Sequence, residues 1–219
     1  MTISAPDTHD DRLDAPTVHR NQGAIVALLS RYLNDASGHA IEIGSGTGQH
    51  VIGFARAFAG LTWWPTDPQP VNLKSIDAWR RHSELKNIAE PMAIDAADEN
   101  WRLGTPGMPP DRDVEVIIAT NVVHITPWQV SQGLFSAAGR YLTPHGHLFL
   151  YGPFARDGAH TAVSNAQFDN SLRMENPEWG VRDMVDLEAL AAGCGLQLTQ
   201  VADMPRDNFV LVFSRSNQA

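Results

Sequence analysis

The chain has 219 residues, of which 43% are hydrophobic and 19% are charged, so it can bury a substantial core as one globular domain. Its formal net charge of −9 and the lack of a basic run argue against nucleic acid as the main partner, because such binding depends on clustered lysine and arginine. A single cysteine, Cys194, excludes an internal disulfide and a cysteine-rich metal site.

The N-terminal segment is polar. Residues 1–19 lack the apolar stretch of a signal peptide, and we interpret them as a flexible tail or flap. No later stretch approaches the roughly 20 apolar residues of a membrane helix. We therefore expect a cytoplasmic protein without a membrane partner. Apolar residues at helical spacing then predict a first helix over 22–33.

Strands and helices alternate along the rest of the chain. Short apolar runs predict the strands, and apolar residues at helical spacing predict the helices. The expected order is strand 40–43, helix 49–58, strand 61–67, helix 69–83, strand 91–94, loop 98–113, strand 114–119, helix 129–142, turn 143–146 and strand 147–151. A long polar and aromatic insertion at 152–182 is followed by helix 183–192 and by strands at 196–201 and 209–214.

This alternation predicts an α/β fold with a mainly parallel seven-stranded sheet, helices on both faces and an antiparallel C-terminal hairpin. Residues 20–215 read as one domain. Pro65 indicates that strand 61–67 lies at an edge or ends there. In such a sheet, ligands bind at the carboxyl ends of the strands, so the strand ends are where we look for a site.

The first strand-to-helix turn carries three closely spaced glycines. Glycine allows a sharp turn and a close approach to a ligand, and the helix that follows adds amide donors. A dinucleotide-binding loop needs a glycine five positions after the first, where this chain has Gln49. The Glu-x-Gly-x-Gly-x-Gly pattern instead resembles the first motif of class I methyltransferases that use S-adenosyl-L-methionine (SAM) and release S-adenosyl-L-homocysteine (SAH). The cofactor-binding candidates here are Glu42, Gly44, Ser45, Gly46, Gly48, Gln49 and His50.

Two acidic residues follow the next two predicted strands. Asp67 lies nineteen residues past Gly48, where a carboxylate accepts ribose hydroxyls in nucleoside-binding folds. Asp95 ends the next predicted strand, in a position to meet the adenine amino group. The alternatives are a nicotinamide dinucleotide in place of SAM, or a tight turn with acids that merely cap helices.

The segment after strand 114–119 passes beside the expected methyl group. Asn121 is a candidate cofactor ligand, and His124 is a candidate base because the histidine pKa lies near neutrality. His124 is equally suited to stack on the cofactor or to cap a helix. Trp128 is either core packing or a wall of the substrate pocket.

The insertion and its flanks are rich in groups suited to a pocket. Long loops with aromatic, Arg and Asn side chains are where an α/β scaffold usually builds its binding site. Arg173 and Arg182 are candidates to clamp a substrate carboxylate or phosphate. The alternative is that Arg182 pairs with Asp183 or Asp186 and that Arg173 is solvated. The substrate candidates are Trp128, Tyr151, Asn165, Phe168, Arg173, Trp179 and Arg182.

Longer motifs carry a more specific resemblance. They are Arg20-Asn21, Gly44 to His50, Trp64 to Asp67, Asn121 to Trp128, Gly133 to Phe135, Tyr151 to Pro153, Ser164 to Asp169, Asn176 to Asp183 and Asp203 to Pro205. Over about 20–215 the chain resembles a family of methyltransferase-like proteins of unassigned substrate, found in bacteria and animals and long catalogued as a domain of unknown function. The resemblance implies a class I SAM fold, a pocket built from the insertion, and Arg20 and Asn21 folded over the cofactor. Arg206 to Phe209 departs from the paired asparagines usual in that family.

The sequence thus predicts methyl transfer from SAM to a nitrogen, oxygen or sulfur atom of a small molecule. Catalysis would consist chiefly of alignment, with a base needed only if the acceptor must lose a proton. The base candidates, in order, are His124, Tyr151 and Asp169. A nicotinamide-dependent oxidoreductase and a non-catalytic SAM-binding protein are the alternatives. The oligomeric state stays open.

Overall fold

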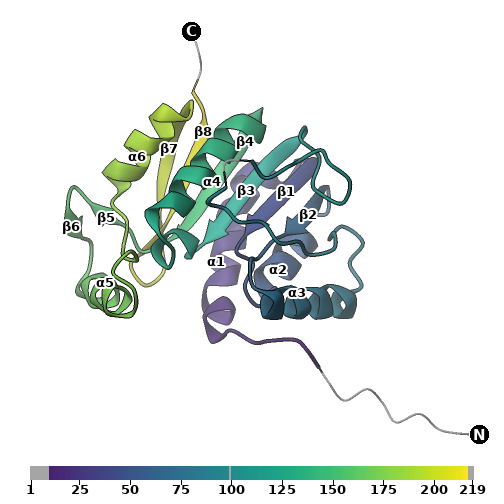
Figure 1. Ribbon diagram of the computed structural model, residues 1–219, viewed down its shortest axis with the longest axis horizontal. Helices are drawn as coiled ribbons and strands as arrows, with labels where there is room; N and C mark the ends of the chain where they lie inside the picture. Colours follow the sequence, from purple (N-terminus) through teal and green to yellow (C-terminus); the bar gives the residue numbers. More distant parts are fainter. Residues whose placement is uncertain (1–9, 99, 217–219) are drawn as a thin grey trace, which may run out of the picture.

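A six-stranded sheet organises the fold in a computed structural model that describes residues 10–98 and 100–216 (Figure 1). Its strands are β1 (Gly38–Ile43), β2 (Leu61–Pro65), β3 (Val114–Thr120), β4 (Leu142–Gly152), β7 (Leu196–Met204) and β8 (Asn208–Arg215). The order is β2-β1-β3-β4-β8-β7, with β1 to β4 parallel and β8 antiparallel to both neighbours. A separate pair, β5 (Ala155–Arg156) and β6 (Ala159–His160), lies in the insertion.

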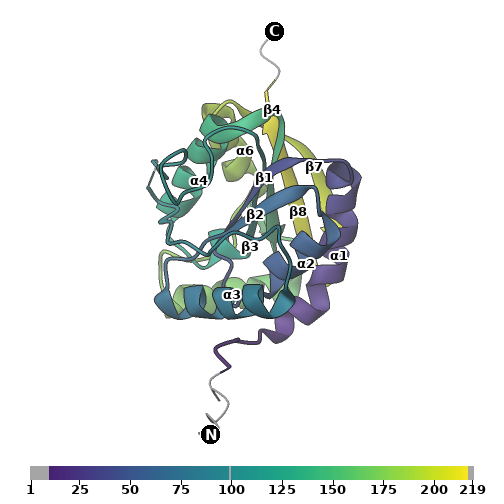
Figure 2. The ribbon, with the colours of Figure 1, turned by 90° about the vertical axis from the view of Figure 1, so that its right-hand side faces the viewer.

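Helices cover both faces of the sheet. They are α1 (Pro16–Leu33), α2 (Gln49–Ala57), α3 (Pro70–Ser83), α4 (Trp128–Tyr141), α5 (Val163–Glu175) and α6 (Met184–Gly193), with a 3-10 turn η1 at Val122–His124. Figure 2 shows α4 and α6 on one side of the sheet and α1 and α2 on the other. Among the described residues, no helix combines the length and apolar character required to cross a membrane.

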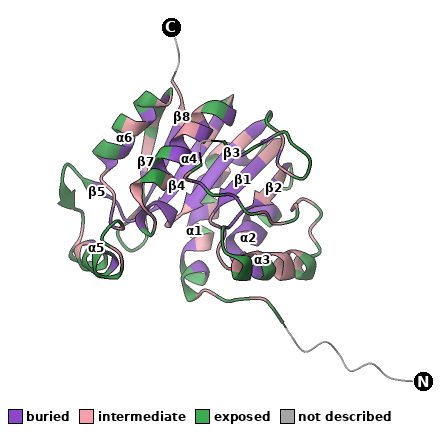
Figure 3. Cartoon of the chain, in the orientation of Figure 1, coloured by how far each residue is buried: buried purple, intermediate pink, exposed green. Residues whose placement is uncertain are grey.

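Each face of the sheet has its own apolar core, and the strands between them are the most buried part of the chain (Figure 3). Trp63 and Phe54 pack where α2 meets the sheet, whereas on the other face Phe135 of α4 packs against Phe213 of β8. Alternate residues of β3 serve the two cores, since Val116 faces one and Ile117 the other. The predicted α/β fold with an antiparallel C-terminal hairpin is therefore confirmed.

The prediction of a seventh strand at 91–94 is wrong. This segment makes only an isolated bridge between Met92 and Thr66, beside the edge strand β2. Pro91 and Pro65 lack an N–H group, so neither can contribute the donors of a continuous ladder. The sheet therefore keeps six strands, and Pro65 does mark the end of an edge strand, as expected.

Larger differences from the prediction concern α1, β4 and the insertion. Helix α1 begins at Pro16, six residues before the expected start, because proline suits the first turn of a helix. The expected turn at 143–146 belongs to β4, next to an irregularity in its pairing with β3. The insertion contains α5, whose buried residues Asn165, Asp169 and Leu172 follow helical spacing but are mostly polar, so apolar periodicity missed it. Residues 1–9 of the predicted tail lie outside the described residues.

Glu42 places a carboxyl group inside the sheet. It is the next-to-last residue of β1, its side chain is buried, and its Oε2 atom has no hydrogen-bond partner among the described residues. Burial raises the pKa of Glu42 from 4.5 to about 7, against a smaller opposing effect of Ser45. The protein thus carries a buried acid that becomes charged near neutral pH.

This burial predicts a pH-dependent stability difference between the wild type and Glu42→Gln. The folded-state pKa is raised, so the contribution of Glu42 is fully present below pH 4.5 and is lost as the pH rises through about 7. Relative to the wild type, the variant should gain roughly 3 kcal/mol in unfolding free energy between acidic pH and pH 8. Denaturant unfolding at several pH values measures this difference.

Glu90→Gln is the matched control, because Glu90 is 89% exposed. Its unfolding free energy should follow the wild-type pH profile. Parallel profiles for Glu42→Gln and the wild type would contradict the assigned burial effect.

Candidate functional site

The glycine loop between β1 and α2 is tightly packed at Gly44 and Gly48 and has free space beside Gly46. A Cβ atom at Gly44 would lie 2.7 Å from Val122 Cγ2, and one at Gly48 would lie 2.8 Å from the Cα atom of Ile76. Gly46 also has a positive φ, of +54°, but a Cβ atom there would have no neighbour within 4 Å among the described residues. Gly46 is therefore the point where the loop backbone is accessible to a ligand.

Asp67 lies two residues past the end of β2 and bonds to this loop. Its Oδ2 atom accepts a hydrogen bond from Gly46 N at 2.9 Å, and its Oδ1 atom accepts from Gln69 N and Asn72 Nδ2. A carboxylate offers about four acceptor positions, so this geometry leaves one on Oδ2 for a ligand. The loop and the first of the two predicted acids therefore lie together.

The segment before α1 lies against the same loop. Gln49, a predicted cofactor ligand, accepts from Ala15 N at 2.7 Å and donates to Asp14 Oδ1 at 2.7 Å. Leu13 N donates to Ser75 Oγ at 2.8 Å, and this hydroxyl donates to the carbonyl of Thr47. Residues 13–15 thus lie over the start of α2 and the middle of α3, beside the glycine loop.

Two other cofactor candidates lie in different surroundings. His50 is buried and stacks on Phe54, and burial lowers its pKa to about 4. Asp95 is exposed, accepts from Ala97 N at 2.9 Å, and lines a separate cavity of about 270 Å³ with Trp101. Within the described chain, no hydrogen bond joins Asp95 to the glycine loop.

A cavity of about 390 Å³, here called the strand-end cavity, gathers six of the predicted residues. Asn121 and Tyr151 come from the ends of β3 and β4, and the bond from Asn121 N to Tyr151 O, 2.8 Å long, joins them. Because Asn121 precedes the Val122 that packs on Gly44, the cavity adjoins the glycine loop. Its lining comprises Thr17, Arg20, Asn21, Asn121, Ile125, Tyr151, Pro153, Asn165, Phe168, Pro205, Arg206 and Asn208.

Sequence reasoning missed part of this lining, most notably Arg206. This residue sits in the β7–β8 turn, far along the chain from every other charged candidate. The departure of Arg206 to Phe209 from the asparagine pattern was the available signal, but a turn residue cannot be assigned to a cavity until the sheet order brings β8 beside β4.

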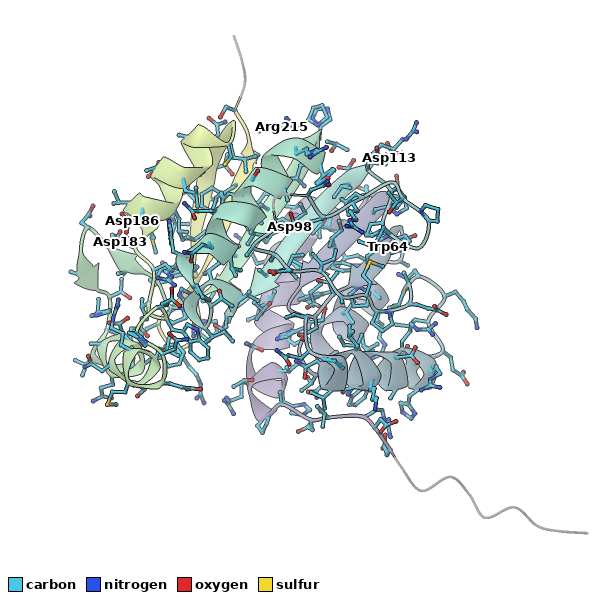
Figure 4. The ribbon with its side chains drawn as sticks, viewed as in Figure 1. Trp64, Asp98, Asp113, Asp183, Asp186 and Arg215 are labelled. Carbon is cyan, nitrogen blue, oxygen red and sulfur yellow. The ribbon has the colours of Figure 1, made fainter. Side chains whose placement is uncertain are left out.

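Four other candidates line a different cavity. This insertion cavity, of about 980 Å³, is bounded by Trp128, Asp169, Arg173 and Arg182 together with the start of α6. Figure 4 shows Asp183 and Asp186 at that helix start. The structure therefore divides the predicted substrate residues other than Trp179 between two cavities.

Both arginines of the insertion cavity have partners inside the protein. Arg173 Nε donates to Asp169 Oδ2 at 2.9 Å. Arg182 donates to the carbonyl oxygens of Val123, Thr126 and Glu178 and lies over the Trp128 ring. Arg182 thus bonds carbonyl oxygens and not the expected Asp183 or Asp186, and Arg173 is paired with Asp169 where solvation was the expected alternative. Trp179, whose backbone N–H donates to the carbonyl oxygen of Asn176, is half-buried and lines neither cavity.

The three predicted bases differ in their surroundings. His124 is completely buried, its Nδ1 accepts from Arg182 N at 3.3 Å, and burial lowers its pKa to about 3. Burial also raises the pKa of the Tyr151 phenol. For Asp169, burial favours the neutral acid, but hydrogen bonds from Arg173 and Val181 outweigh it and lower the pKa. Of the three, Tyr151 alone lines the strand-end cavity.

Comparison with solved structures identifies the fold. The mitomycin 7-O-methyltransferase MmcR superposes with a TM-score of 0.70 at 16% identity, over 91% of this chain and 54% of that chain. An O-methyltransferase family protein from Burkholderia thailandensis gives 0.72 at 15%, over 90% and 57%. CalO1, a methyltransferase in calicheamicin biosynthesis in its SAH-bound form, gives 0.66 at 18%, over 88% and 54%.

This chain spans little more than half the length of these proteins, and it shares with them the class I methyltransferase fold. The resemblance in sequence is confirmed as well. A family model described as "Protein of unknown function (DUF938)" matches residues 12–215, which is nearly the whole chain. The chain belongs to this family.

Proposed function

We propose that this protein transfers a methyl group from SAM to a heteroatom of a small molecule bound in the strand-end cavity. The observation that carries the proposal is the contact between Asp67 and Gly46, at the carboxyl ends of β1 and β2. It combines an accessible loop backbone with a carboxylate that still has a free acceptor position. Parallel sheets bind nucleosides at this location.

The residues around the loop fit SAM. The open side of Gly46 leaves room for a ligand against the backbone, and the remaining acceptor position on Asp67 Oδ2 suits a ribose hydroxyl. The unpartnered carboxyl oxygen of Glu42 suits a cation, and SAM is cationic at its amino group and its sulfur. When bound, SAM supplies an electrophilic methyl group with a good leaving group already attached.

The protein itself positions the acceptor and limits the access of water. Val122 packs on Gly44 and directly follows Asn121, which lines the strand-end cavity, so the cavity lies near the loop. Catalysis would then consist chiefly of aligning the acceptor with the methyl group. Residues 13–15, bonded to Gln49 and Ser75, cover one side of the loop and limit access of water.

The surroundings of the three predicted bases support a reaction without a protein base. His124 is buried and uses Nδ1 as an acceptor, so its neutral ring carries the proton on Nε2 and has no free lone pair. The raised pKa of Tyr151 keeps the phenol protonated at neutral pH, and Asp169 is paired with Arg173. We propose that the acceptor atom is already nucleophilic at the working pH.

A glycine pair tests the cofactor site. Gly46→Ala should weaken SAH binding at least tenfold, because it puts a methyl group into the space that the cofactor needs. Gly195→Ala is the matched control, since Gly195 also has a positive φ and no neighbour within 4 Å among the described residues. Both variants should lose similar thermal stability. Calorimetry that finds equal SAH affinities in the two variants would count against the proposed site.

Label transfer tests the reaction. With methyl-labelled SAM and a cell extract, label should move to molecules of low mass, and Asp67→Asn should abolish the transfer. Mass spectrometry of the labelled fraction identifies the acceptor atom. Label that stays on SAM would favour a binding protein, and label on proteins or nucleic acids would rule out a small acceptor.

A further inference from the structure

The strand-end cavity carries an excess of positive charge. Its lining includes two guanidinium groups, Arg20 and Arg206, and no carboxylate. The whole chain has a formal net charge of −9, so an uncompensated positive cavity runs against the overall charge. Such a local field attracts anions into a cleft.

Neither arginine has an ion-pair partner in the described part of the chain. Arg12, Arg80, Arg81 and Arg173 each contact a carboxylate within 4.0 Å, whereas Arg182 and Arg215 donate to backbone carbonyls. No hydrogen bond from a side-chain nitrogen of Arg20 or Arg206 occurs among these residues. Their donors are therefore available to a ligand, and the guanidinium fork matches the geometry of an oxyanion.

The backbone of Arg206 is held in an uncommon conformation. Arg206 and Asp207 have φ values of +63° and +56°, in the left-handed region that disfavours side chains with a Cβ atom. Asn208 Nδ2 stabilises the turn through the carbonyls of Pro205 and Arg206. Such strain is maintained where the surrounding structure and a function require it.

Asn165 fixes this turn against the insertion. Its side chain is 5% exposed, and its Nδ2 atom donates to Asp207 O at 2.9 Å and to Thr161 Oγ1 at 3.0 Å. Nearly one helical turn later on α5, Phe168 lines the same cavity. Helix α5 thus positions Arg206 and also supplies an apolar wall, which Ile125 extends.

We propose that the strand-end cavity binds an acceptor with a small apolar body and an oxyanion, a carboxylate or a phosphate, which Arg20 and Arg206 recognise. Phe168 and Ile125 contact the apolar body, and the phenol of Tyr151 donates a hydrogen bond inside the cavity. This inference rests on the proposed methyl transfer for its biological meaning. The preference for an anion can be measured by binding alone, without methyl transfer.

The experiment compares charged probes with a neutral probe that carries the same phenyl ring. Benzoate and phenyl phosphate should bind the SAH-loaded protein at least tenfold more tightly than benzamide, measured by ligand-observed NMR at millimolar concentration. Arg206→Gln should remove this preference and leave the affinities for benzamide and SAH unchanged. Arg206→Lys should restore part of it. Arg56→Gln, which removes an exposed charge from the last turn of α2, is the matched control and should behave as the wild type.

Arg206→Gly separates this role from a structural one. Glycine relieves the positive φ, so the melting temperature should stay equal or rise while anion binding is lost. Equal affinity for benzoate and benzamide, or no binding of either anion, overturns the proposal. A loss of SAH affinity in Arg206→Gln also overturns it, because the arginine would then belong to the cofactor site. Anion binding that persists in a protein unable to bind SAH supports the anion site and refutes the proposed methyl transfer.

Discussion

The hydrogen bond from Gly46 N to Asp67 Oδ2 is the contact on which the rest of the site depends. It joins the ends of two neighbouring parallel strands and holds Gly46, where a Cβ atom would have no neighbour within 4 Å among the described residues. The packing of Val122 on Gly44 then carries this geometry to the ends of β3 and β4, where the strand-end cavity lies. The proposed cofactor site and the strand-end cavity therefore lie along the same edge of the sheet.

The sequence predicted those features that depend on local chemistry. Apolar runs located β1, β3 and the C-terminal hairpin, and the glycine spacing located the loop, because both patterns reflect backbone requirements of a few residues. The prediction of a strand at 91–94 was wrong because two prolines limit its pairing. Pro91 lies beside the end of β2, which is also a proline, and only the fold shows that these two segments are neighbours.

The residues of the substrate pocket were harder to predict, since their availability depends on which side chains form hydrogen bonds or ion pairs within the protein. Arg173 and Arg182 were suitable anion ligands by type, but the fold gives them Asp169 and three backbone carbonyls. Asn165 belonged to a predicted motif, yet its bond to the carbonyl of Asp207 joins residues 42 positions apart. Side-chain type predicted which chemistry is available, and tertiary contacts decided where it is used.

An experimental structure of the SAH complex tests the central claim most directly. The account predicts the ribose hydroxyls on Asp67, the homocysteine part along Gly46, and the sulfur directed toward the strand-end cavity beside Asn121. SAH bound elsewhere, with Asp67 turned away from the loop or the space beside Gly46 filled by side chains, would contradict the account.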